Sequence, residues 1–92
     1  MTTYNGWTNY ETWNVKLWLD NDEGTYDEVR AMARRSRSAY DLGQELREFV
    51  LDGMPDLGAS MYADILGAAL RDVNWQEIAE AYREDEDAEV EA

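Results

Sequence analysis

The chain has 92 residues, the size of one domain, and carries 21 Asp and Glu against eight Lys and Arg, a formal net charge of −13. A surface this acidic repels nucleic-acid phosphates and anionic lipids, so we expect no direct binding to nucleic acid or to a membrane. The absence of Cys and His excludes disulfides and thiolate metal sites, and removes the commonest general base.

Large apolar side chains are frequent enough to build a core. Hydrophobic residues make up 45% of the chain and include four Trp and six Tyr, which is too much apolar surface for a disordered protein. No apolar stretch is long enough to cross a membrane, and no basic-then-apolar leader opens the chain. We therefore expect a cytoplasmic protein.

The patterning predicts an all-α fold, a single compact bundle of about five short helices. Residues 1–7 are expected to be extended. Thr8 and Glu11 form a capping box, which predicts a first helix ending near residue 21. The apolar side chains of this helix cover an arc of roughly 240°, so we expect it to lie at the centre of the fold. Asn14 falls within that arc and is expected to hold the extended segment against the helix.

Two further helices are predicted before the single proline. A capping box from Thr25 to Glu28 begins the second, and Ser38 caps the third, which Gly53 and Pro55 end. The second helix also carries a basic cluster, for which we favour charge balance with acidic neighbours over contact with a phosphate or a partner. The cluster consists of Arg30, Arg34, Arg35 and Arg37.

The last two helices are expected over residues 59–73 and from residue 75 onward, where Asn74 is a cap. Tyr62 and Ile65 are predicted to face the core with the other apolar residues of the fourth helix. Because acidic residues dominate from Glu84 onward, we expect a helical domain over residues 1–83 and a disordered acidic tail over residues 84–92.

The sequence contains no complete catalytic or metal-binding motif. The segment 20–28 resembles a calcium loop in composition, but its glycine and acidic residues do not fall at the positions of an EF-hand. With so many acidic residues, closeness of two carboxylates carries no information about acid–base catalysis. The serines have no histidine to activate them. We therefore expect no enzyme, no metal site and no cofactor.

The densest feature of the chain is the series of aromatic residues over positions 4–18, most of which we expect in the core, while a few are candidates for contact with a protein partner. Three aromatic residues are candidates for partly exposed contacts, and four acidic residues are candidates for electrostatic contacts with the same partner. The aromatic candidates are Tyr4, Trp7 and Tyr10, and the acidic candidates are Asp20, Asp22, Glu23 and Asp27.

The string from Gly6 to Asn21 reads GWTNYETWNVKLWLDN. It resembles the hallmark of an uncharacterised family of small proteins carried by bacteriophages and plasmids, and residues 72–79 resemble a second block of that family. The resemblance implies an accessory protein of a mobile element, acting on host defence. It supplies no catalytic or binding residues.

Two functions follow as hypotheses. In the first, the protein binds a host protein through an apolar interface and inhibits or redirects it. In the second, its carboxylates mimic DNA and occupy the cationic cleft of a host restriction or CRISPR nuclease. The chain is expected to be a monomer or a homodimer, and the salt dependence of binding separates the two hypotheses.

Overall fold

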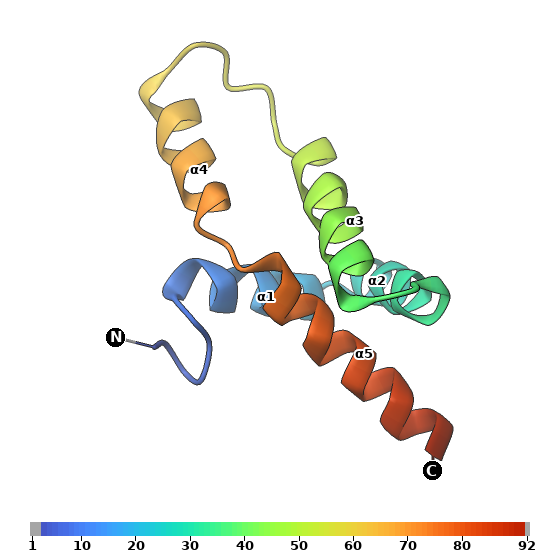
Figure 1. Cartoon of the computed structure of the whole chain (residues 1–92). Coiled ribbons are helices and arrows are strands. Elements are labelled where there is room, and N and C mark those ends of the chain that lie inside the picture. Colours follow the sequence, from blue (N-terminus) through green and yellow to red (C-terminus); the bar gives the residue numbers. More distant parts are fainter. Residues whose placement is uncertain (1–2, 92) are drawn as a thin grey trace.

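The computed structural model describes residues 3–91 of the backbone and the side chains of residues 3–88. Within this range the fold is all-α, as expected. Five helices follow one another along the chain: α1 (Tyr10–Asn21), α2 (Glu23–Arg35), α3 (Ala39–Asp52), α4 (Met61–Arg71) and α5 (Trp75–Glu91) (Figure 1). None of the helices in the described range is long and apolar enough to cross a membrane.

A tight turn precedes α1, where we expected an extended segment. Tyr4 and Trp7 exchange two backbone hydrogen bonds of 2.8 Å. Between them, Asn5 and Gly6 both have positive φ angles, 47° and 87°. Asn-Gly is the residue pair that favours such a two-residue turn, because both residues tolerate the left-handed backbone region. The expectation of an extended segment was therefore wrong for Tyr4–Trp7.

The cap of α1 lies one residue later than predicted. The side chain of Asn9 accepts a 2.9 Å hydrogen bond from the backbone N–H of Thr12, so Asn9 is the N-cap. The backbone N–H of Thr8 instead donates to the Glu77 carboxylate of α5, at 3.1 Å. The capping box was thus misassigned because Thr8 bonds to a residue far along the chain.

The N-terminal segment and α1 are joined to the start of α5 by polar contacts. Asn9 donates from Nδ2 to the backbone carbonyl of Asp72 at 2.8 Å, and the hydroxyl of fully buried Thr12 accepts from the backbone N–H of Asn74 at 2.9 Å. We expected Asn14 to connect the N-terminal segment to α1. Its side chain instead lines a surface groove, and the bonds of Asn9 and Thr12 run to the start of α5 and not to the N-terminal segment.

The core lies between α3 and α5, with α1 and α2 packed around them. The buried apolar residues are Leu19, Val29, Met32, Ala33, Leu42, Leu46, Val73, Trp75, Ile78, Ala79 and Tyr82. The expectation that the first helix is central was wrong, because Leu19 is its single buried apolar residue and Trp18 is 66% exposed. The central position belongs to α5, whose Ile78 and Tyr82 are almost completely buried.

Short polar caps set the starts of the other helices. The Asp22 carboxylate accepts from the backbone N–H of Thr25, so α2 begins at Glu23, earlier than the predicted capping box. Ser38 caps α3 as predicted, by accepting from the backbone N–H of Asp41. Asn74 likewise accepts from the backbone N–H of Glu77 at the start of α5, as predicted.

The helix α4 stands apart from the other helices, and the connection over residues 53–60 lies at its far end (Figure 1). All residues of α4 are described, and none of them is buried. Tyr62 and Ile65, predicted to face the core, are 66% and 61% exposed. The prediction failed because the apolar stripe on which they lie has no neighbouring helix to cover it.

The acidic segment from residue 84, expected as a disordered tail, continues α5 as far as Glu91. Glu86 is only 9% exposed, and its carboxylate accepts a 2.9 Å hydrogen bond from Nε of Arg30 on α2. This ion pair compensates the burial of the carboxylate and gives the end of α5 a tertiary contact. The tail prediction for residue 92, and for the side chains of residues 89–92, falls outside the described atoms.

Candidate protein-binding site

An open groove runs along the surface where α1 and the start of α2 meet the carboxyl end of α3. Its volume is about 620 Å³, within the range of ligand-binding pockets. The groove is lined by Asn14, Val15, Trp18, Leu19, Thr25, Phe49, Val50, Asp52 and Gly53. The lining is therefore mostly apolar and is contributed by three helices.

The helix geometry explains this lining. Asn14, Val15, Trp18 and Leu19 are spaced so that they share one side of α1, because residues three and four apart lie on the same face. Val15, Phe49 and Val50 are partly buried against the core and form the inner part of the groove. Trp18 is 66% exposed and presents a large apolar surface to solvent.

The start of α2 carries three of the acidic candidates, but none of them lines the groove, and Glu23 and Asp27, two residues from Thr25 on the helix, lie away from the side that Thr25 presents. Thr25 lines the groove, and Asp22, Glu23 and Asp27 lie within three residues of it, all exposed. The hydrogen bond from the Thr25 backbone lowers the pKa of Asp22, so this carboxylate remains charged further into the acid range. The structure thus brings three of the four predicted acidic candidates together, with Asp52 at the groove itself.

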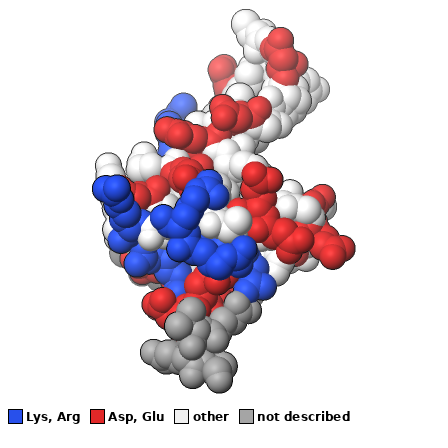
Figure 2. Space-filling model, turned by 90° about the vertical axis from the view of Figure 1, so that its right-hand side faces the viewer, with Lys and Arg blue, Asp and Glu red and all other residues white. Residues whose placement is uncertain are grey.

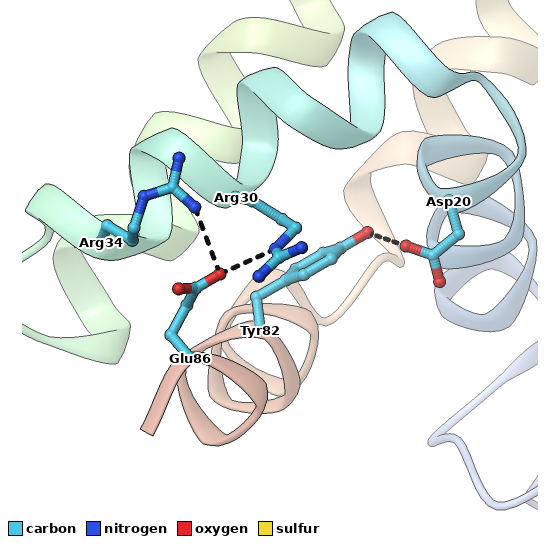
Figure 3. Close-up of polar contacts among 5 residues, drawn as sticks. All are labelled: Asp20, Arg30, Arg34, Tyr82 and Glu86. Atoms are coloured by element: carbon cyan, nitrogen blue, oxygen red, sulfur yellow. Dashed lines mark hydrogen bonds and ion pairs between the residues drawn. The ribbon is translucent and has the colours of Figure 1, made fainter. Parts of the chain in front are cut away.

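The fourth acidic candidate, Asp20, is engaged within the fold (Figure 3). Its carboxylate accepts a 2.5 Å hydrogen bond from the Tyr82 hydroxyl and forms an ion pair with Lys16. The Lys16 ammonium also lies 4.5 Å from the centroid of the Tyr82 ring. Burial, together with the hydrogen bond to Asp20, raises the pKa of Tyr82 above its ordinary value. Asp20 therefore supports the core and is a poor candidate for contact with a partner.

The raised pKa of Tyr82 predicts a loss of stability in alkali. Folding favours the neutral phenol of Tyr82. Its contribution to the free energy of unfolding is complete below the pKa of about 10 that the phenol has in the unfolded chain, and it is lost as the pH rises above that value. We expect the free energy of unfolding, measured by urea titration, to fall more steeply between about pH 10 and pH 11.5 in the wild type than in Tyr82→Phe. Tyr40→Phe, at an exposed position, should keep the wild-type slope. Equal slopes in all three proteins would contradict this assignment.

The three aromatic candidates pack among themselves and their neighbours, and none of them lines the groove. The rings of Tyr4 and Tyr10 meet edge-on with centroids 5.2 Å apart, and both contact Trp13, at 4.9 and 5.6 Å. Trp7 is half-buried against the core. Tyr4 is 39% and Tyr10 51% exposed, so this aromatic cluster presents one edge to solvent.

The arginines of α2 pair with acidic residues of neighbouring helices, and Figure 2 shows a band of basic side chains bordered by acidic ones on one face of the molecule. Arg30 and Arg34 both approach the Glu86 carboxylate, at 2.9 and 3.7 Å (Figure 3). Arg35 lies 3.4 Å from Glu45 of α3. The favoured interpretation of the cluster, charge balance with acidic residues of neighbouring helices, is thereby confirmed for these three arginines.

No group of three or more acidic side chains within the described range is close enough to hold a metal ion.

Comparison with known families matches residues 1–90 to a family of unknown function, DUF7249. The chain belongs to this family. Comparison with curated proteins and with solved structures gives no match.

The groove of this DUF7249 protein is a feature that the sequence analysis missed. Because the first helix was expected at the centre of the fold, its Trp18 was expected to be buried, whereas it is 66% exposed. A usable signal existed in α1, where apolar residues cover too wide an arc for one neighbouring helix to bury. That arc indicated a second apolar face, and the structure shows that this face is left open to solvent.

Proposed function

We propose that this DUF7249 protein acts by binding another protein in the groove between α1, α2 and α3. The observation that carries the proposal is Trp18, 66% exposed at the edge of an apolar groove of about 620 Å³. Exposed tryptophans beside apolar pockets are the residues that most often dominate binding energy at protein interfaces. The N-terminal motif supports an accessory protein of a phage or plasmid, which makes a protein of the host cytoplasm the expected partner.

The groove favours an apolar helix with flanking basic residues as the bound segment. A cleft formed by packed helices receives the apolar face of an amphipathic helix, which inserts side chains at helical spacing. Asp52 at the groove attracts a basic segment and disfavours an acidic one. Binding there would block the partner's own use of that helix, which is a direct route to inhibition.

The test is affinity capture from a host lysate by the wild type, by Trp18→Ala and by Tyr40→Ala. Tyr40 is a matched control because it is 62% exposed but lies near the opposite end of α3 and does not line the groove. We expect the wild type and Tyr40→Ala to capture the same protein, and Trp18→Ala to bind it at least about 30-fold more weakly. Equal capture by all three proteins would contradict the proposal.

Salt distinguishes this function from the alternative, an acidic mimic of DNA that binds a host nuclease. The net charge of −13 favours the mimic, but Asp20, Asp22 and Glu45 already bond within the fold. A groove interface should persist at high salt, whereas a mimic should be released. Capture that is insensitive to Trp18→Ala, but abolished by salt and by Glu23→Lys with Asp27→Lys, would establish the mimic instead.

A further inference from the structure

A pocket separate from the groove lies between α3 and α4. Both helices and the first residue of α5 contribute to its lining, and its volume is about 250 Å³. Arg47 and Leu51 line it from one face of α3, whereas Phe49 and Val50 line the groove from another face of the same helix. None of the described residues lines both cavities, so an inference about this pocket does not rest on the groove proposal.

Most of the pocket wall is apolar. The apolar side chains come from α3, the connection after it, α4 and the start of α5, and they are Leu51, Met54, Leu70 and Trp75. Trp75 is only 9% exposed, so the core holds its ring in place at the pocket. Because the volume is just below the range of pockets that hold drug-sized ligands, the pocket is suited to a small molecule.

The charged residues that line this pocket are both arginines, in a chain whose net charge is −13. Neither Arg47 nor Arg71 has an acidic residue three or four positions away along the chain, which is the spacing of ion pairs on a helix. Among the described side chains, residues 3–88, neither guanidinium group forms an ion pair or a hydrogen bond. The pocket therefore carries two positive charges that this part of the chain leaves without an anionic partner.

The side chain of Arg71 folds back along α4 toward the pocket. Its Nη1 atom lies 3.8 Å from the position that a Cβ atom on Gly67 would take, and Gly67, one turn earlier, also lines the pocket. Glycine inside a helix is unfavourable compared with alanine. Here the missing side chain leaves room for the guanidinium group at the edge of the pocket.

Two such guanidinium groups beside an apolar wall are suited to a ligand that has an anionic end and an apolar body. We infer that the pocket binds a small organic acid, with its carboxylate between Arg47 and Arg71 and its apolar body against Leu70 and Trp75. A carboxylate can accept hydrogen bonds from both arginines at once, because each of its two oxygens offers two acceptor positions.

A carboxylate suits this site better than a phosphate or a neutral group. The negative charge of the whole chain repels a dianion more strongly than a monoanion. A neutral ligand of the same shape would cover the apolar wall but would leave both arginines without an anionic partner.

The bound acid also links α4 to α3. None of the residues of α4 is buried, and its Arg71 shares the pocket with Arg47 of α3, which has the same charge. A carboxylate between them replaces repulsion by attraction. The backbone amides of α4 should therefore exchange with solvent more slowly when the acid is bound.

The test uses phenylacetate as the probe and follows its binding to the purified full chain by NMR. We expect the signals of the Trp75 indole N–H and of the Nε–H groups of Arg47 and Arg71 to shift. The shifts should saturate with a dissociation constant of about 1 mM, since a ligand of about ten non-hydrogen atoms has limited binding energy. The indole signal of Trp18, which lies at the groove, should not move.

Two further ligands separate the contributions of charge and apolar surface. Phenylacetamide is a neutral molecule of nearly the same shape, and acetate has the carboxylate without the apolar body. Each should bind at least about tenfold more weakly than phenylacetate.

Variants test the residues that hold the ligand. Arg47→Gln and Arg71→Gln should each weaken phenylacetate binding at least about tenfold. Arg37→Gln is the matched control, because it removes the same charge from an exposed position outside the pocket, and it should bind like the wild type. Gly67→Leu should fill the pocket and lose binding while keeping the helical circular dichroism, since leucine is a good helix former.

A wild type whose signals show no saturating shift up to about 20 mM phenylacetate would overturn the inference. Equal binding of phenylacetamide would do the same, since it would show that the carboxylate is not recognised. If Arg37→Gln weakened binding as much as Arg71→Gln, the effect would belong to the charge of the whole chain and not to this pocket.

Discussion

Ile78→Ala is expected to lower the free energy of unfolding by about 2–5 kcal/mol, because it opens a cavity in the centre of the core. Ile78 is fully buried on α5, where α5 packs against α3. Urea unfolding followed by circular dichroism measures the change, and the unfolding midpoint should fall accordingly.

The matched control for this prediction is Trp18→Ala, which removes a larger side chain from the surface. Because Trp18 is 66% exposed, we expect its loss to change the free energy of unfolding by no more than about 0.5 kcal/mol. The expectation that the first helix lies at the centre of the fold implied the opposite result, in which Trp18→Ala costs more stability than Ile78→Ala. A larger loss of stability in Trp18→Ala than in Ile78→Ala would contradict the observed packing.

Gly43→Val is expected to destabilise the protein by about 1–3 kcal/mol, because α3 and α5 approach each other closely at this glycine. A Cβ atom at position 43 would lie 3.3 Å from backbone atoms of Trp75 and Gln76. Backbone atoms cannot move aside as the end of a flexible side chain can, so the two methyl groups of valine would push the helices apart. Thermal unfolding monitored by circular dichroism measures the effect.

Gly67→Val provides the control, since it makes the same substitution inside α4. The nearest atom to a Cβ at position 67 is the end of the Arg71 side chain, at 3.8 Å. Valine has a higher helix propensity than glycine, so this variant should be as stable as the wild type or slightly more stable. Equal destabilisation by both substitutions would show that α3 and α5 do not pack as closely as described.

Local signals allowed much of the fold to be predicted from the sequence. Ser38 and Asn74 were assigned correctly as caps, because each bonds to a backbone group only three residues away. The same kind of short-range periodicity places Ile78 and Tyr82, four residues apart, on one face of α5, and both are buried. Structural features that depend only on residues close in sequence can therefore be predicted from the sequence.

The errors arose where the partner of a residue is distant in sequence or absent. Glu86 was assigned to a disordered tail, but its partner Arg30 is 56 residues away. Thr8 was taken for a cap, whereas its backbone N–H bonds to Glu77. Periodicity showed that Tyr62 and Ile65 share a face, but it could not show whether another helix covers that face.

The candidate site was predicted less completely than the fold, for a related reason. None of the acidic candidates at the start of α2 lines the groove, and Asp20 was included because its bond to Tyr82 spans 62 residues. The groove was missed because its lining combines residues of α1 and α3, which no local pattern joins. Whether a large apolar residue such as Trp18 lies in a core or on a surface depends on the packing of whole helices.

Hydrogen exchange of the backbone amides, measured by NMR on the purified wild type, tests the central claim most directly. That claim is that α3 and α5 form the centre of the fold and that α5 remains part of it up to Glu86. The slowest amides should therefore lie in α3 and α5, and protection should persist through residues 84–86. Slowest exchange in α1, or unprotected amides from residue 84 onward, would contradict the account.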